Sequence, residues 1–496
     1  MPIREPLRLR RWLPFLLVPA AAGIGAAVAV QPLAAPATVA AVVALWMLAL
    51  GRRVVAVFHL CLGAILIGYA FLGRGFAYVG VAPLYVGEVV LAVSLLAMLM
   101  TLPRARIGRL HVLLLAFMAW GLVRTLPYVG VYGVDALRDA VMWAYGFFAL
   151  AVSLTVDAEH FPRLAAVYRR LIPVFLLWVP VAAGLTIVFG DGLPHLPGSP
   201  VAFIDVKAGD LGVQLAGVGA FLLLGLYGRA SMVAELWTSA AWLVGAGLVA
   251  SLNRGAMAAL AAAGTTILFV RRSSRWFRVG LVGLLMLGAV ALVNPEIETP
   301  GSRAISFDQV VANATSIFGD QPQDRANAAT KEWRLQWWGA ISDYTFGGRY
   351  FWTGKGFGVN LANDDGFQVA ADKSLRAPHS IDFDVLARTG VPGLFLWLTL
   401  NAAFGMAVLR AAFRAHRAGR TFWVQVLGWV FVYWLAAFIN GSFDVYLEGP
   451  QGGIWFWAVM GLGLAAMRAA AADESGVEPA PGSARSGSLA PAGQQG

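Results

Sequence analysis

The sequence predicts an all-α polytopic membrane protein with about fourteen transmembrane helices, in a range of roughly 12–14. Of its 496 residues, 59% are hydrophobic and 13% are charged, whereas about a quarter of the residues in a soluble domain are charged. The mean hydropathy is +0.70. Apolar runs of about 18–20 residues recur along most of the chain, and each is long enough to cross a bilayer as a helix.

The first apolar run follows an Arg-rich N-terminus, which resembles a signal peptide. This run is too long for a signal peptide and a second one follows almost at once, so we expect an uncleaved first helix. The predicted membrane spans are 12–30, 33–50, 54–72, 85–102, 110–126, 139–156, 171–190, 210–228, 232–250, 255–270, 276–293, 381–409, 421–439 and 452–468.

The basic residues support this count. If the N-terminus is cytoplasmic, every second connection should be rich in Lys and Arg, and this alternation holds along the whole chain. The net charge of +10 therefore sets the orientation in the membrane and does not indicate nucleic-acid binding. The single cysteine, Cys61, lies in an apolar run, which excludes a disulfide framework and a thiolate metal site.

Four regions follow from this topology. Residues 1–293 should carry transmembrane helices 1–11, and residues 381–470 should carry helices 12–14. Between them, 294–380 forms one long loop on the outer side, with mixed charge and enough length for short helices of its own. Residues 471–496 are mostly Ala, Gly, Ser and Pro, so we expect a disordered cytoplasmic tail.

Two basic residues enter helices from the outer side. Arg254 lies in the sequence SLNRG (251–255), in the very short connection between two apolar runs. It is either an interfacial arginine that reaches the lipid headgroups or an anion site, in which the guanidinium binds phosphate oxygens and the next helix adds its dipole. Lys207 either helps to bind phosphate or pairs with Asp210.

The long outer loop contains Arg334 within an aromatic cluster. Trp333 and Trp337 are four residues apart and share a helix face, and Trp338 lies beside that face. Such a cluster suits stacking on a sugar or anchoring of the helix in the headgroup region. The two interpretations are compatible, because an anchored helix would present Arg334 to a lipid phosphate.

His379 precedes an apolar run and, with His195, is one of two histidines that the topology places outside. His195 lies in a Pro- and Gly-rich loop and is typical of a turn residue. Asp382 follows His379 by three residues, within reach of one ring nitrogen if the helix has begun. A carboxylate there would fix the imidazole tautomer and leave the other nitrogen as a base. The structural alternative is a histidine that caps the helix or bonds to headgroups.

The sequence has no Gly-rich nucleotide loop and no cluster of His, Cys, Asp and Glu at metal-ligand spacing. We therefore expect no cofactor and no metal. If the protein is a transferase, its donor must already be activated, as a lipid pyrophosphate is.

The order of these features resembles the O-antigen ligase and O-antigen polymerase superfamily. The resemblance covers roughly 200–460 and is carried by SLNRG (251–255), Trp333 with Arg334, GKGFG (354–358), and His379 ahead of RTGVPG (388–393). Two positions depart from the family pattern: Ser380 stands where the family usually has Asn, and Asn253 where it usually has Ser.

The resemblance implies a metal-independent, inverting glycosyltransferase of the membrane (GT-C-like) type, in the bacterial inner membrane with its site facing the periplasm. The implied donor is an oligosaccharide on undecaprenyl pyrophosphate, and the acceptor is a glycan or lipid A core. By the same resemblance, Arg254 and Arg334 hold the pyrophosphate as it leaves, and His379 assists the acceptor hydroxyl. The long loop and the His-Ser pair favour a polymerase over a ligase or a protein glycosyltransferase.

Two other classes remain open from the sequence. Fourteen spans would also suit a polysaccharide or lipid transporter (flippase), although the sequence shows neither repeat symmetry nor many charges within the spans. A membrane scaffold without catalysis would give no reason for Arg254, Arg334 and His379 together on the outer side.

Overall fold

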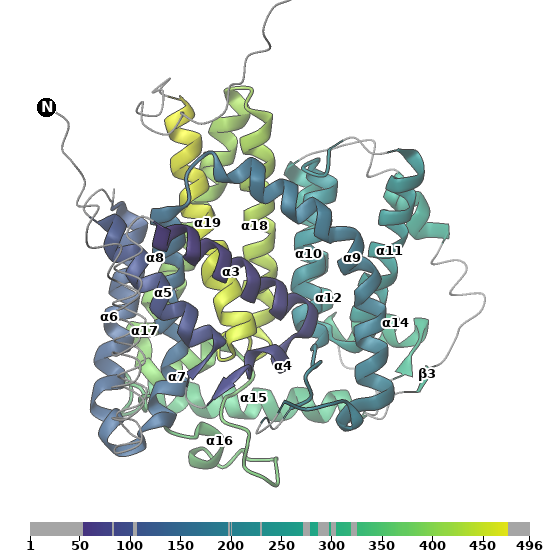
Figure 1. The fold of residues 1–496 in the computed structure, drawn as a ribbon. Coiled ribbons are helices and arrows are strands. Elements are labelled where there is room, and N and C mark those ends of the chain that lie inside the picture. The colour runs from purple at the N-terminus through teal and green to yellow at the C-terminus, as the bar shows by residue number, and fades with distance from the viewer. Residues whose placement is uncertain are drawn as a thin grey trace, which may run out of the picture.

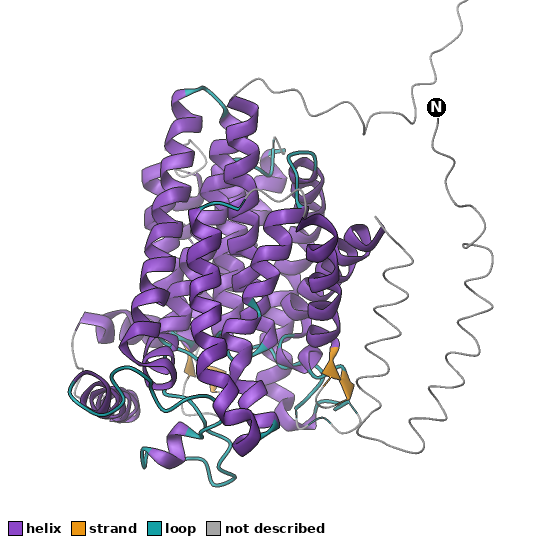
Figure 2. Cartoon of the chain, turned by 90° about the vertical axis from the view of Figure 1, so that its left-hand side faces the viewer, coloured by secondary structure: helices purple, strands orange, loops and turns teal. Residues whose placement is uncertain are grey.

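The computed structural model describes residues 53–81, 84–102, 107–196, 199, 201–228, 231–270, 278–285, 297–298, 304–318 and 325–474. Most of this part is helical, and the long helices run side by side as a bundle (Figures 1 and 2). The predicted spans 12–30 and 33–50 lie outside the described residues, as does the tail from residue 475 onward. Helix α19 continues to Glu474, beyond the expected start of the tail at 471.

The helices before the outer loop are α3 (Arg53–Leu72), α4 (Arg74–Ala77), α5 (Val86–Thr101), α6 (Arg109–Tyr132), α7 (Val134–Ala144), α8 (Gly146–Thr155), α9 (His160–Phe189), α10 (Ala208–Leu224), α11 (Met232–Leu252) and α12 (Arg254–Val270). A 3₁₀ turn, η3 (Gly190–Gly192), follows α9.

The remaining helices are α14 (Phe307–Phe318), α15 (Arg325–Phe346), α16 (Leu361–Asp364), α17 (Ile381–Arg417), α18 (Thr421–Ser442) and α19 (Pro450–Glu474). Two short antiparallel hairpins pair β1 (Gly80–Val81) with β2 (Leu84–Tyr85) and β3 (Ile297–Glu298) with β4 (Ala304–Ile305).

The membrane character predicted from the sequence is confirmed. Within the described residues, eight helical segments are long and apolar enough to cross a membrane, with α7 and α8 counted as one. The shorter apolar helices α5, α10 and α12 coincide with three further predicted spans. Of the span at 276–293, only 278–285 is described, and it is helical. The protein is therefore a multi-pass membrane protein, while the count of fourteen stays a prediction.

Helix α18 lies at the centre of the bundle and packs against α10, α12, α17 and α19. Aromatic rings fill this core, and their polar atoms bond to the backbone of neighbouring helices. The indole nitrogen of Trp429 donates to the Gly217 carbonyl at 3.1 Å, and that of Trp457 donates to the Met142 carbonyl at 3.1 Å. These bonds let large apolar rings be buried without stranding an N–H group.

Helix α15 lies crosswise at one end of the bundle, with α16 beyond it (Figure 1). It packs against α17, and a small separate core forms beneath it from Trp337, Ile341, Leu361, Leu386 and neighbouring residues. Because this core joins the outer loop to α17, the loop is a folded layer on the bundle rather than a loose connection.

Helix α17 is interrupted at Gly390, whose φ of +71° and ψ of −173° are not helical. The GKGFG turn (354–358) satisfies the backbone groups that this kink leaves open. The amides of Lys355 and Gly356 donate to the carbonyls of Ala387 and Arg388 at 2.7 and 3.0 Å. A Cβ on Gly390 would lie 2.5 Å from the Phe351 carbonyl oxygen, so only glycine fits. The kink therefore fixes the first two turns of α17, directly after His379, against the outer loop.

Candidate functional site

His379 adopts a left-handed backbone conformation, with φ of +54°. Among the described non-glycine residues, only His379 and Lys373 have positive φ. Trp338 stabilises this conformation. Its indole nitrogen donates to the Pro378 carbonyl at 2.9 Å, and its ring stacks on Phe383 with ring centroids 4.8 Å apart. Backbone strain of this kind costs about 1–3 kcal/mol and gathers at functional sites. The fold therefore holds a strained backbone conformation that sets the direction of the His379 imidazole.

The carboxylate beside His379 is Asp444, in the short loop after α18. Its Oδ1 lies 3.7 Å from His379 Nδ1, and the two side chains are 17% and 29% exposed. The prediction that Asp382 orients His379 was wrong. The Asp382 carboxylate accepts from Trp397 Nε1 and from Ser442 Oγ, both at 2.8 Å, so it ties α17 to α18. The turn at His379 faces the imidazole toward a neighbouring loop rather than along its own helix.

Asp444 is held in its ionised form. Burial is the largest influence and raises its pKa, but the adjacent His379 imidazole, the positive charge of Lys207 and a hydrogen bond from the Val445 amide outweigh it. The pKa of Asp444 falls to about 2 as a result. A fixed negative charge therefore faces Nδ1 of His379, and the other ring nitrogen, Nε2, is the one left for proton transfer.

Arg334 reaches the same loop from α15. Its Nη1 donates to the Phe443 carbonyl at 2.9 Å, next to Asp444. Trp333, one residue earlier, meets His379 edge-on with ring centroids 6.2 Å apart. Arg334 therefore contacts the loop that carries Asp444, and its neighbour Trp333 contacts the imidazole of His379.

The first residues of α10 and α12 also meet the end of α18. A Cβ on Gly209 would lie 3.2 Å from Asp444 Oδ2, and one on Gly255 would lie 3.2 Å from the Cβ of Phe443. Lys207 is the N-cap residue of α10, and Arg254 is the first residue of α12. The structure therefore brings the starts of α10 and α12, which carry Lys207 and Arg254, together with Arg334 and His379 near residues 440–444.

The three tryptophans of the aromatic cluster occupy different environments in the structure. Trp337 is fully buried, stacks on Phe367 at 5.5 Å and donates to Asp365 Oδ2 at 2.6 Å. Trp337 is therefore part of the small core beneath α15, and its role in substrate binding stays a prediction. Trp338 supports the His379 turn, which leaves Trp333 as the member of the cluster that lies beside the imidazole.

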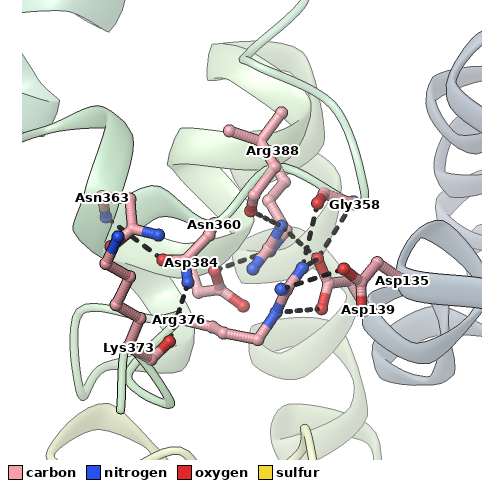
Figure 3. Close-up of polar contacts among 10 residues, drawn as sticks. Asp135, Asp139, Gly358, Asn360, Asn363, Lys373, Arg376, Asp384 and Arg388 are labelled. Atoms are coloured by element: carbon pink, nitrogen blue, oxygen red, sulfur yellow. Dashed lines mark hydrogen bonds and ion pairs between the residues drawn. The ribbon is translucent and has the colours of Figure 1, made fainter. Parts of the chain in front are cut away.

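A buried ionic cluster fastens the outer loop to the bundle (Figure 3). Arg388 donates to Asp139 on α7 and to Asp384 on its own helix, both at 2.8 Å. Arg376, shortly before His379, donates to the same Asp139 at 3.1 Å, and the Gly358 amide does so at 2.9 Å. Arg388 and Asp139 are 1% and 5% exposed. Asp139 thus joins two points of the outer loop, and helix α17, to α7.

Glu448 extends this cluster toward the site loop. Burial, and then the nearby charge of Asp384, raise the pKa of Glu448 well above its ordinary value, which favours the neutral acid. Glu448 and Asp444 belong to the same short connection between α18 and α19. This connection is therefore anchored at one end by the buried cluster and at the other by His379 and Arg334.

The sequence patterns assigned no role to Asp444, Glu448 or Asn440. The available signal was a pair of acidic residues in the last outer loop, on the same side as His379. No described residues form a group of three or more His, Cys, Asp or Glu with the placement of metal ligands.

Comparison with known families agrees with this geometry. Residues 239–398 match the family model described as O-antigen ligase. A comparison with curated proteins gives no match. The matched segment holds Arg254, Arg334 and His379, together with the GKGFG turn and the kink of α17. Over this segment, about a third of its length, the chain is therefore similar to the O-antigen ligase family.

Proposed function

We propose that the protein transfers a glycan from undecaprenyl pyrophosphate to an acceptor hydroxyl at the outer face of the bacterial inner membrane, in surface polysaccharide biosynthesis. The observation that carries this proposal is the meeting of Lys207, Arg254, Arg334 and His379 around the outer end of α18. A strained histidine next to a fixed carboxylate, within a set of cations, suits transfer from an anionic leaving group.

The chemistry follows from the roles of these groups. Nε2 of His379 takes the proton of the acceptor hydroxyl as its oxygen forms a bond to the anomeric carbon. The bond from that carbon to the pyrophosphate oxygen breaks, and undecaprenyl pyrophosphate leaves with the electron pair. Attack opposite the leaving group inverts the anomeric configuration, and Asp444 stabilises the imidazolium that forms.

The cations act on the leaving group. Negative charge grows on the pyrophosphate as the bond breaks, and guanidinium groups held in place by the fold stabilise that charge without rearranging. Arg254 and Arg334 supply bidentate donors, and Lys207 adds a point charge. This arrangement needs neither a metal ion nor a cofactor, and it binds both lipids at the membrane edge, where the entropy of encounter is already reduced.

The test is a reconstituted transfer assay with undecaprenyl-pyrophosphate oligosaccharide, first alone and then with lipid A core. A product ladder from donor alone identifies a polymerase, and product only with core identifies a ligase. His379→Ala should abolish transfer, whereas His195→Ala, the matched outer-side histidine, should retain it. Consumption of donor at the wild-type rate by His379→Ala would remove the base from the mechanism.

Arg254→Lys keeps the charge but loses the planar fork. We expect turnover to fall by about 10²–10³, because one preorganised donor to the developing charge is lost. The exposed Arg349→Lys serves as the control and should transfer normally. No donor consumption by the wild-type protein with any acceptor would overturn the transferase proposal and favour a lipid transporter.

A further inference from the structure

Asn440, near the outer end of α18, has no exposed surface, and neither Oδ1 nor Nδ2 of its amide has a hydrogen-bond partner among the described residues. A buried polar group without a partner destabilises the folded protein. Native proteins bond most of their buried side-chain polar atoms, so an amide with both ends open points to a ligand.

The amide lies between the first turns of two helices. A Cβ on Gly209 of α10 would be 3.0 Å from Oδ1 and 3.3 Å from Nδ2, and one on Gly255 of α12 would be 3.6 Å from Oδ1. Glycine at both helix starts therefore lets their backbones approach Asn440. The helix dipole places about half a positive charge at each N-terminus, and in α12 the Ala256 amide already donates to Asn253 Oδ1 at 2.9 Å.

The surrounding charges favour an anion. Lys207 and Arg254 stand at the starts of these two helices, and both helix dipoles add to their charge. The carboxyl groups of Asp444 and Asp210 oppose this positive charge, but Oδ1 of Asp444 lies 3.7 Å from Nδ1 of His379. A neutral amide at the centre of this group donates hydrogen bonds to phosphate oxygens without adding another charge that would need burial.

We infer that Asn440 binds the diphosphate of the lipid donor, with Nδ2–H₂ donating to a phosphate oxygen as negative charge grows on the leaving group. The inference rests on the proposed function and adds a substrate-contacting residue from α18. It also explains why an amide that costs stability stands at the meeting point of α10, α12 and α18.

The test uses two variants of similar size. Asn440→Asp places a carboxylate against the diphosphate, and we expect undecaprenyl pyrophosphate and inorganic pyrophosphate to bind about 100-fold more weakly, as for like charges held in close contact. Asn440→Leu removes the open amide, so we expect a higher Tm together with a turnover lowered by about 10²-fold.

Asn401 provides the matched control on α17. Its amide is also buried but fully bonded: Nδ2 donates to the Trp397 carbonyl at 2.9 Å, and Oδ1 accepts from Trp434 Nε1 at 3.2 Å. Asn401→Leu should therefore lower the Tm, opposite to Asn440→Leu.

The outcomes separate this inference from the proposed function. If the wild-type protein binds neither pyrophosphate probe, the proposed donor class fails. If the wild-type protein binds them and Asn440→Asp binds them equally well, the donor class stands and the role of Asn440 is refuted. Full transfer by Asn440→Asp would instead assign the amide to a sugar hydroxyl, which also refutes it. A lower Tm for Asn440→Leu would make Asn440 a structural residue.

Discussion

The buried cluster around Asp139 leads to a prediction about the outer layer of the protein. Asp139 accepts hydrogen bonds from Arg388, Arg376 and the Gly358 amide (Figure 3). Asp139→Asn keeps the size of the side chain but removes its charge and replaces one acceptor oxygen with an NH₂ donor. That donor would face a guanidinium, and Arg388, which is 1% exposed, would keep only Asp384 as an ionic partner.

The expected cost is large for one substitution. Breaking a buried ion pair by removing one partner costs about 3–5 kcal/mol. Because Asn retains one acceptor, we take the lower end, about 3 kcal/mol, which corresponds to a roughly 100-fold larger opening constant. The cost should appear first as local opening of the layer, because two of the three groups bonded to Asp139, Arg376 and the Gly358 amide, belong to the outer loop.

Amide hydrogen exchange in lipid nanodiscs measures this opening. Peptides that cover residues 354–360 should exchange about 100-fold faster in Asp139→Asn than in the wild type. The control is Glu235→Gln, which removes the ion pair of Glu235 with Arg278, 2.6 Å long and with Arg278 39% exposed. An exposed pair contributes about 0.2–1 kcal/mol, so peptides 354–360 should be unaffected. Exchange in Asp139→Asn within about threefold of the wild type would refute the reasoning.

Three further predictions concern the site itself. Asp444→Asn should lower kcat about 10- to 1000-fold with little change in KM, because a unit charge 3.7 Å from His379 is worth about 1–4 kcal/mol for an effective dielectric constant between 80 and 20; an unchanged kcat would exclude it as the partner of His379. The pKa of Asp444 falls from 3.8 to about 2 on folding, so its ionisation stabilises the protein above pH 4 and this contribution is lost as the pH falls toward 2. The Tm difference between the wild type and Asp444→Asn should therefore shift in that window, and a constant difference would contradict the assignment. Gly390→Ala should lower the Tm and slow transfer together, because its Cβ would lie 2.5 Å from the Phe351 carbonyl oxygen; a normal Tm would show that the kink tolerates a side chain.

The position of His379 shows how far local sequence signals reach. Hydropathy placed the start of α17 at residue 381, and the helix begins there. The same reasoning gave His379 a partner three residues ahead, which assumed helical geometry at the histidine. The left-handed turn at His379 breaks that assumption, because a single positive φ redirects the side chain toward a loop that follows the next helix.

Trp337 and Asp139 show that local sequence also does not determine which side chains pack together. A spacing of four residues correctly places Trp333 and Trp337 near each other, with ring centroids 5.2 Å apart. It does not tell which of the two the layer beneath α15 will cover, since that depends on Phe367 and Asp365. Asp139 lay within a predicted span, and its partners are more than 200 residues later in the chain.

The sequence by itself determined the membrane class and the course of most described helices, and it predicted the family resemblance and the cations and histidine of the candidate site, because hydropathy, charge alternation and short motifs are properties of neighbouring residues. Only the tertiary structure decided that Asp444 rather than Asp382 faces His379, that Trp337 is core, and that Asn440 lies between two helix N-termini. Those outcomes depend on which helix ends meet at the C-terminal end of α18, and helix packing, not local sequence, sets that meeting.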